Sequence, residues 1–316
     1  MNKIIEVKNL TKQFKDVLAV DDLSFTVEAG RVYGFLGQNG AGKSTTIRML
    51  LTLIRPMSGH IEIFGLDLRN HRKEILSQIG AIIERPDLYK YLTALENLRI
   101  FGAMSGVKLT EKKLIDQLAM VGLADRAHSK VKTYSQGMKQ RLGIATALVH
   151  DPRLIILDEP TNGLDPQGIA DIRNLILFLK REMGKTLLIS SHLLSEVEVI
   201  ADSMLIIDKG RKLVEGRVNE LFDPAETIVE LNTLDDERAY HYLQNSIFNA
   251  HLHAKRNDCI QLKLHRDKVP GVLKELVKTD IDIISVNSRH SLEDYFLSLT
   301  GATENVKSTT SGATTV

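Results

Sequence analysis

The chain has 316 residues, with 41 Lys and Arg against 40 Asp and Glu, a formal net charge of +1 and 43% hydrophobic residues. These proportions are typical of a soluble globular protein and exclude collagen, a coiled coil and global disorder. The near-neutral charge also argues against a general nucleic-acid binder, which needs many uncompensated basic side chains on one face. At about 150 residues per domain, the length predicts two domains.

The chain carries few signals for export, disulfides or membrane spanning. The amino-terminal residues alternate charged and apolar types and lack the apolar region of a signal peptide. No run approaches the ~20 apolar residues that cross a bilayer. Cys259 is the sole cysteine, so no intrachain disulfide can form, and we expect it to be a small buried hydrophobic residue. If the protein serves a membrane process, another chain must span the membrane.

Short β-branched runs alternate with longer amphipathic stretches over the first 216 residues, which predicts a mainly parallel sheet covered by helices. The run Leu154–Leu157 is apolar on both faces, as expected of a central parallel strand. The expected strands are Ile4–Val7, Val32–Leu36, Ile61–Phe64, Ile79–Ile83, Leu154–Leu157, Thr186–Ser190 and Met204–Asp208.

The strand pattern stops between Thr93 and His150, where three amphipathic segments follow one another. The expected helices are Ala94–Ser105, Glu111–Val121 and Gln136–Val149. We therefore predict a helical subdomain, at about residues 90–150, inserted into an α/β domain that takes residues 1–220.

The carboxy-terminal third predicts a separate α+β domain at residues 225–300. The order β-α-β-β-α-β is that of a split βαβ (ferredoxin-like) fold. The expected elements are Thr227–Leu231, Asp235–Gln244, Ala250–Ala254, Cys259–Leu264, Lys268–Lys278 and Ile281–Val286. A final helix is expected at Ser291–Leu299, and the Ser/Thr/Gly-rich tail at 301–316 is expected to be disordered.

A phosphate-binding loop lies between the strand Val32–Leu36 and a helix predicted over Thr45–Leu53, which is the context that this motif requires. The motif G-x-x-x-x-G-K-[ST] is matched by Gly37, Gln38, Asn39, Gly40, Ala41, Gly42, Lys43, Ser44 and Thr45. Backbone N–H groups and the helix N-terminus would surround phosphates, while Lys43 would reach the β and γ oxygens and Ser44 would hold Mg²⁺. A glycine turn before an ordinary helix explains neither of these two side chains.

Two carboxylates, Asp158 and Glu159, follow the buried strand Leu154–Leu157 directly. Ligand chemistry collects at the carboxyl ends of parallel strands, where the phosphate-binding loop also lies. We expect Asp158 to orient the Mg²⁺ shell and Glu159 to polarise the water that attacks a γ-phosphate. Simple helix capping is the alternative for this pair.

Residues 134–141 read Tyr-Ser-Gln-Gly-Met-Lys-Gln-Arg. Ser135 is a good N-cap for the helix that follows, and that helix N-terminus with Gly137 can bind an anion. The segment is similar to the signature Leu-Ser-Gly-Gly-Gln, and over roughly residues 3–220 the chain resembles an ATP-binding-cassette (ABC) ATPase. The resemblance implies a P-loop NTPase core with amino-terminal antiparallel β strands, ATP and Mg²⁺ as cofactors, and hydrolysis of ATP.

The resemblance also implies roles for further residues. His192, which follows a buried strand, would be the switch histidine that contacts the γ-phosphate, and with Lys43 and Glu159 it completes the catalytic set. Phe14 would stack on adenine. Residues of the signature and of the D-loop at 163–165 would contact, in trans, the ATP held by a second copy of the chain: Ser135, Gln136, Gly137 and Asp165.

The chain departs from the family pattern at two places. Glu84 stands where the family usually has a glutamine, and its carboxylate could still reach Mg²⁺. The implied metal-binding residues are therefore Ser44, Asp158 and Glu84. Gln136 and Met138 replace a glycine and the terminal glutamine of the signature, whereas Ser135 and Gly137 are kept, so we expect hydrolysis to survive.

Three segments, Ile79–Pro86, Tyr134–Arg141 and Leu292–Leu297, are similar to the bacitracin and lantibiotic-immunity branch of drug exporters. This resemblance implies the energy-supplying subunit of an exporter of peptide antibiotics, lantibiotics or related drugs. Its partners would be a transmembrane permease and, with ATP bound, a second copy of the chain, with no nucleic acid. Its place would be cytoplasmic, peripheral on the inner face of the cell membrane.

Other functions remain open at this point. A soluble ABC ATPase acting on ribosomes or DNA usually has two cassettes or a long coiled-coil insertion, and neither is seen here. An exporter of lipid, polysaccharide or ions fits the same motifs. A P-loop kinase or GTPase does not account for Tyr134–Arg141 or His192, and a binding module with a decayed site does not fit the intact Lys43 and Glu159. The carboxy-terminal domain is expected to enlarge the dimer interface, and a regulatory ligand site is the alternative.

Overall fold

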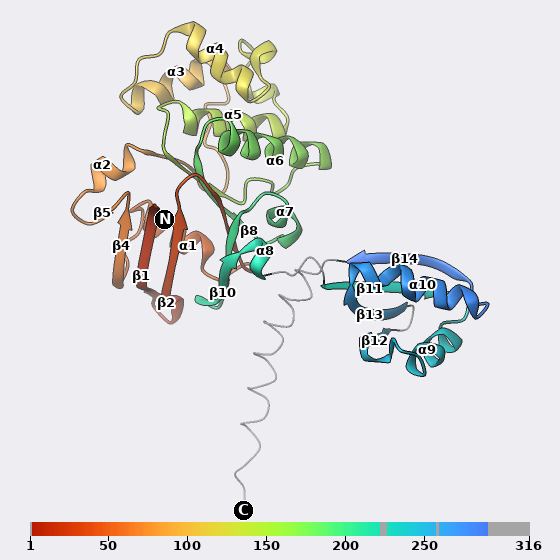
Figure 1. The fold of residues 1–316 in the computed structure, drawn as a ribbon. Helices are drawn as coiled ribbons and strands as arrows, with labels where there is room; N and C mark the ends of the chain where they lie inside the picture. The colour runs from red at the N-terminus through yellow and green to blue at the C-terminus, as the bar shows by residue number, and fades with distance from the viewer. Residues whose placement is uncertain (1, 222–225, 257–258, 290–316) are drawn as a thin grey trace, which may run out of the picture. The chain divides into compact units, whose positions relative to one another are not determined.

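The computed structural model describes residues 2–221, 226–256 and 259–289, and these residues form two compact units that divide between Val218 and Asn219 (Figure 1). The helix predicted at Ser291–Leu299 and the tail at 301–316 lie outside the described residues. Along the described stretches, every helix is too short or too polar to cross a membrane.

A six-stranded sheet forms the centre of the first unit. Its strand order is β10-β9-β3-β8-β7-β6, and all neighbouring strands are parallel except β10 and β9. Every residue of β3, β7 and β8 is buried, as expected of central strands covered on both faces. The strands are β3 (Val32–Leu36), β6 (Ile79–Ile82), β7 (Leu154–Asp158), β8 (Thr186–Ser191), β9 (Ser203–Asp208) and β10 (Arg211–Arg217).

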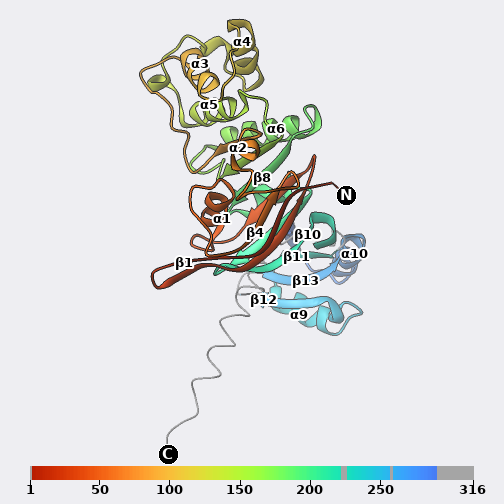
Figure 2. The ribbon, with the colours of Figure 1, turned by 90° about the vertical axis from the view of Figure 1, so that its left-hand side faces the viewer.

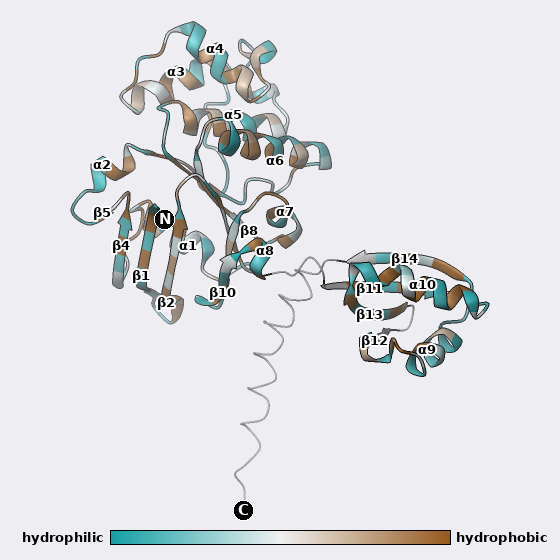
Figure 3. Cartoon of the chain, viewed as in Figure 1, coloured by the Kyte–Doolittle hydropathy of each residue, from teal (hydrophilic) through white to brown (hydrophobic). Residues whose placement is uncertain are grey.

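This sheet separates two hydrophobic cores. Because side chains alternate along a strand, Ile155 and Leu157 of β7 face a core shared with α5 and α6. Leu154 and Ile156 face the other core, which is shared with α1 and the amino-terminal strands. Figure 3 shows hydrophobic and hydrophilic residues mixed along α5 and α6, as in helices with one buried face. The three helices are α1 (Lys43–Leu50), α5 (Gln136–Leu148) and α6 (Pro166–Arg181).

The first unit also contains an antiparallel sheet of order β2-β1-β4-β5, which packs on the core shared with α1 (Figure 2). Its β1 is much longer than the predicted strand Ile4–Val7. Register shifts around Leu10 and a positive φ of 48° at Asn9 interrupt its alternation of buried and exposed residues. The strands are β1 (Lys3–Phe14), β2 (Val17–Glu28), β4 (Ser58–Ile63) and β5 (Leu66–Asp67).

Three helices between β6 and β7 form the predicted helical insertion (Figure 1). Thr93 begins the first of them with a capping box, in which its hydroxyl accepts from Glu96 N and the Glu96 carboxylate accepts from Thr93 N. The insertion contains α3 (Ala94–Met104), α4 (Glu111–Met120), short 3₁₀ turns at Ala124–Arg126 and Val131–Thr133, and α5. Outside the insertion, the first unit contains α2 (Arg72–Leu76) and α7 (Leu194–Glu198), and α8 (Val218–Leu221) spans the boundary between the two units.

The second unit has the predicted order β-α-β-β-α-β. Its antiparallel sheet has the order β12-β13-β11-β14, in which the first and third strands of the unit pair at the centre, as in a split βαβ fold. Leu231 and Leu262 of the sheet share a core with Leu243 and Leu276 of the helices. The elements are β11 (Glu226–Thr233), α9 (Asp236–Gln244), β12 (Leu252–Arg256), β13 (Cys259–His265), α10 (Val269–Lys278) and β14 (Ile283–Arg289).

The fold class predicted from the sequence is confirmed, whereas several details of the prediction are wrong. The sequence pattern does not predict β2 and β10 as individual strands, because half-exposed polar residues interrupt their hydrophobic pattern. The helix predicted over Thr45–Leu53 ends at Leu50, and Thr52 adopts a left-handed φ of 58°. Cys259 is partly exposed rather than fully buried.

The partly buried imidazole of His150 makes the stability of the first unit depend on pH. Burial lowers the pKa of the His150 imidazole, and the hydrogen bond of its Nε2 to Ile79 O only partly opposes this shift. Its buried Nδ1 has no hydrogen-bond partner among the described residues. The unfolded chain therefore binds a proton at His150 at higher pH than the folded chain, so this contribution to stability is present above about pH 6.5 and is lost as the pH falls.

We expect His150→Gln to reduce the fall in thermal unfolding midpoint between pH 7.5 and pH 5.5, measured by calorimetry on the full chain. His128→Gln is the matched control, because His128 is exposed. An equal pH dependence in wild type and His150→Gln would contradict the assignment.

Candidate active site

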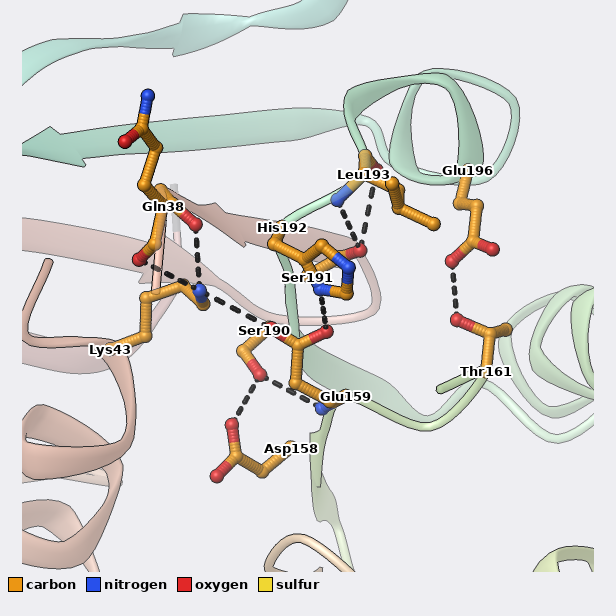
Figure 4. Close-up of polar contacts among 11 residues, drawn as sticks. Gln38, Lys43, Asp158, Glu159, Thr161, Ser190, Ser191, His192, Leu193 and Glu196 are labelled. Carbon is orange, nitrogen blue, oxygen red and sulfur yellow. Dashed lines mark hydrogen bonds and ion pairs between the residues drawn. The ribbon is translucent and has the colours of Figure 1, made fainter. Parts of the chain in front are cut away.

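Three neighbouring parallel strands end at the same edge of the central sheet. In the register, Leu36 of β3 lies beside Ser191 of β8, and Asp158 of β7 lies beside Ser190 of β8. The phosphate-binding loop follows β3, the carboxylate pair lies at the end of β7, and the predicted switch histidine follows β8. Figure 4 shows that the side chains of Lys43 and His192 point toward the carboxylate of Glu159.

The ammonium of Lys43 is held inside the phosphate-binding loop. Its Nζ donates to the carbonyl oxygens of Gly37 at 2.6 Å and Gln38 at 3.3 Å, and the side chain is only 6% exposed. Lys43 is the first residue of α1, directly after Gly42, which has a φ of 106°. A Cβ at Gly42 would lie 2.5 Å from Ala19 O, so only glycine fits this turn.

Asp158 is the last residue of β7 and is 1% exposed. Ser190 Oγ donates to its Oδ1 (Figure 4). Its other oxygen, Oδ2, is buried and has no hydrogen-bond partner among the described residues. A buried carboxylate oxygen of this kind requires a cationic or donor partner. The arrangement fits a metal ion at this position.

Glu159 lies between two cationic or donor side chains. Its Oε1 is 3.2 Å from Lys43 Nζ, and its Oε2 accepts a hydrogen bond from His192 Nδ1 at 2.7 Å. Its φ is 50°, a left-handed conformation that turns the residue out of the strand direction. The backbone N–H of Glu159 donates to Ser190 Oγ at 2.9 Å and to Ser190 O at 3.2 Å, which holds this turn on β8.

The predicted trans-acting residues lie at two neighbouring helix N-termini. Ser135 is the N-cap of α5 and accepts from Met138 N at 3.2 Å, and Asp165 is the N-cap of α6 and accepts from Gly168 N at 3.0 Å. A Cβ at Gly137 would lie 3.9 Å from the Cα of Gly168, so the two N-termini are adjacent. Ser135, Gln136 and Asp165 are exposed.

Two predicted site residues have other partners. Glu84 has a φ of 60°, is 63% exposed and pairs with Arg48 of α1 at 2.5 Å. Phe14, at the end of β1, is 44% exposed, and Lys12 Nζ lies 5.0 Å from the centre of its ring. Neither residue contacts the group formed by Lys43 and Glu159 through any interaction found in the described part of the chain.

Comparison with known proteins identifies the family. A family model described as ABC transporter matches residues 20–162. The bacitracin transport ATP-binding protein BcrA of Bacillus licheniformis is 44% identical over 304 residues, which are 95% of this chain and 98% of BcrA. This chain belongs to the ABC transporter family. It is an ATP-binding subunit and an ATPase of that family.

Two further similarities agree with this assignment. The lantibiotic transport ATP-binding protein SrtF of Streptococcus pyogenes is 41% identical over 228 residues, which are 72% of this chain and 95% of SrtF. A solved dimeric cassette, MJ0796 in a post-hydrolysis state bound to ADP and Pi, is similar with a TM-score of 0.62 and 25% identity. The match covers 68% of this chain and 99% of MJ0796.

Three residues at this site of the ATPase, Thr161, Ser190 and Glu196, are not predicted by any motif of the sequence. Ser190 bonds both carboxylate-bearing residues, and Thr161 Oγ1 donates to Glu196 Oε2 beside them (Figure 4). A serine at the end of an otherwise apolar strand was the available signal for Ser190. Thr161 and Glu196 are 35 residues apart, and no spacing rule connects them.

We expect Ser190→Ala to lower the free energy of unfolding by about 1–3 kcal/mol, because the buried carboxylate of Asp158 would lose its donor. Urea denaturation followed by circular dichroism measures this change. Ser195→Ala is the control, since Ser195 is exposed on α7. If the two variants unfold at the same urea concentration, the proposed importance of the Ser190 contact is wrong.

Proposed function

We propose that this ATPase powers a membrane exporter of peptide antibiotics such as bacitracin or lantibiotics, through a separate transmembrane permease. The convergence of Lys43, Glu159 and His192 at one sheet edge supports hydrolysis as the energy source. The printed roles of BcrA and SrtF in bacitracin and lantibiotic transport support the cargo. The chain would act on the cytoplasmic, inner face of the cell membrane, as a subunit peripheral to its permease.

The roles of the site residues follow from their positions. The phosphate-binding loop, residues 37–45, would bind the ATP phosphates, with Lys43 on the β and γ oxygens. Glu159 would accept a proton from the attacking water. His192, which contacts the carboxylate of Glu159, would hold that carboxylate in place and would also reach the γ-phosphate. Phe14 presents an exposed ring at the end of β1, on which adenine would stack.

A magnesium ion fits the residues at this edge. Asp158 offers a buried oxygen that has no donor in the described part of the chain, and Ser44 is half-buried beside Lys43. When bound, the ion would neutralise charge on the β and γ phosphate oxygens. Within the described residues, no group of three His, Cys, Asp or Glu side chains could hold a metal by itself, so phosphate oxygens would complete its coordination. Glu84 would join it only by leaving Arg48.

We also propose that two copies pair head to tail when ATP is bound. Ser135, Gln136, Gly137 and Asp165 would then contact the ATP of the partner. The exposure of Ser135, Gln136 and Asp165 suits contact with an anion, and so do the two adjacent helix N-termini, whose first N–H groups have no partner within the helix. Residues 1–220 would form the cassette, and residues 225–300 an accessory domain that enlarges the dimer interface.

The carboxylate assignment is tested by a pair of substitutions. We expect Lys43→Ala to abolish ATP binding, because the loop loses the cation that contacts the phosphates. Glu159→Gln should bind ATP normally, lower kcat by at least about 100-fold and accumulate an ATP-bound dimer, since the amide cannot accept the proton. Radiolabelled ATP hydrolysis and size-exclusion chromatography measure both effects.

The exposed Lys113→Ala and Glu182→Gln are matched controls that should behave as wild type. Normal hydrolysis by Glu159→Gln would overturn the catalytic assignment.

The transporter assignment is tested by trapping tagged Glu159→Gln with Mg·ATP in gently solubilised native membranes, and identifying co-purifying chains by mass spectrometry. We expect a polytopic membrane protein that is absent from a Lys43→Ala preparation. Recovery of ribosomal or other soluble partners alone would instead favour the soluble ABC ATPase. Deletion of the gene should sensitise cells to bacitracin or a lantibiotic, and unchanged sensitivity would contradict this cargo class.

A further inference from the structure

The short loop Glu159–Thr161 is attached to the β8–α7 segment at both of its ends. At the first end, the N–H of Glu159 donates to Ser190 O and Oγ. At the other end, Thr161 Oγ1 donates to Glu196 Oε2 (Figure 4). Pro160 lies between them and has no N–H to contribute. The side-chain bond from Thr161 therefore connects the second half of this loop to α7.

Glu196 lies on the same segment as His192. Leu193 N donates to Ser191 Oγ at 3.0 Å, which fixes the turn around His192, and α7 begins at the next residue, Leu194. Glu196 belongs to the first turn of α7, whose buried side chains Leu194 and Val197 anchor the helix on the first unit. The carboxylate of Glu196 is thus held four residues beyond the histidine.

Two side-chain hydrogen bonds join the loop Glu159–Thr161 to the segment His192–Glu196. One is the hydrogen bond of 2.7 Å from His192 Nδ1 to Glu159 Oε2, and the other is the bond from Thr161 to Glu196. Within this loop, Glu159 has a left-handed φ of 50°. A non-glycine residue keeps such a conformation only when its surroundings hold it there. Glu196 supplies one of these constraints.

The environment of Glu196 is suited to a strong contact. A small hollow beside it is lined mainly by apolar groups, with Arg173 as its one basic side chain among the described residues. Its lining includes Pro160, Ile169, Ile176, Ile189 and Ile200. A hydrogen bond to a charged group in such surroundings is stronger than one in bulk water.

The same loop continues to Asp165. Asn162 N donates to Glu159 O at 3.2 Å, and Leu164 N donates to Thr161 O at 3.2 Å, so successive turns connect the carboxylate to the N-cap of α6.

We propose that Glu196 is a positioning residue for hydrolysis, which acts through Thr161 to hold Glu159 and His192 in their working arrangement. This inference rests on the catalytic roles proposed above for those two residues. Glu196 itself is assigned no contact with ATP. Its effect is on the rate of the chemical step, not on nucleotide affinity.

The test compares kcat and KM for Glu196→Ala, Glu196→Gln, Thr161→Val and the double variant Thr161→Val/Glu196→Ala. We expect Glu196→Ala and Thr161→Val to lower kcat about tenfold each, the usual effect of one lost hydrogen bond to a charged group, with KM nearly unchanged. The double variant should be no slower than either single variant. Glu196→Gln keeps a carbonyl acceptor for the Thr161 hydroxyl and should recover most of the rate.

Glu182→Ala, an exposed glutamate at the end of α6, is the matched control. Additive losses in the double variant, no rescue by glutamine, or a rise in KM with constant kcat would each overturn the inference. Hydrolysis at the normal rate by Glu159→Gln would instead contradict the proposed catalytic roles. Loss of activity in Glu159→Gln but not in Glu196→Ala would remove the positioning role alone.

Discussion

The in-register ends of three parallel strands are the constraint on which the rest of this ATPase depends. Because β3, β7 and β8 finish at one edge, the loops behind them bring Lys43, Glu159 and His192 within hydrogen-bond or ion-pair distance. Side chains alternate along a strand with a period of two, so a slip of one residue between β7 and β8 would reverse every face. The two cores packed on either side of the sheet exclude that slip.

Neighbouring carboxylates acquire different environments from one backbone turn. Asp158 is still part of β7, is 1% exposed and is bonded by Ser190 within the sheet. Glu159 leaves the strand through a left-handed φ, and its carboxylate meets Lys43 and His192 at the surface of the site. The environment of Asp158 therefore suits contact with a buried cation, and that of Glu159 suits proton exchange with water.

Local helix physics and the proposed function use the same residues without conflict. Ser135 and Asp165 cap α5 and α6 with their side chains, and within the described residues each cap accepts from one N–H group. The other N–H groups of the first turn have no partner within the helix. The exposed N-termini of α5 and α6 therefore present N–H groups that could also bind a phosphate of a second molecule.

The sequence alone determined those features of the protein that depend on residues close together in the chain. The phosphate-binding loop, the apolar strand before Asp158 and Glu159, the helical insertion and the order of the second unit could be predicted from local patterns and spacing. The exact extents of β1, β2 and β10 could not, because bulges and half-exposed edges interrupt the alternation. Only the tertiary structure decided which side chains meet, such as Arg48 with Glu84 and Thr161 with Glu196. These contacts join segments far apart in the chain, and their formation depends on strand register and helix packing that no local sequence pattern encodes.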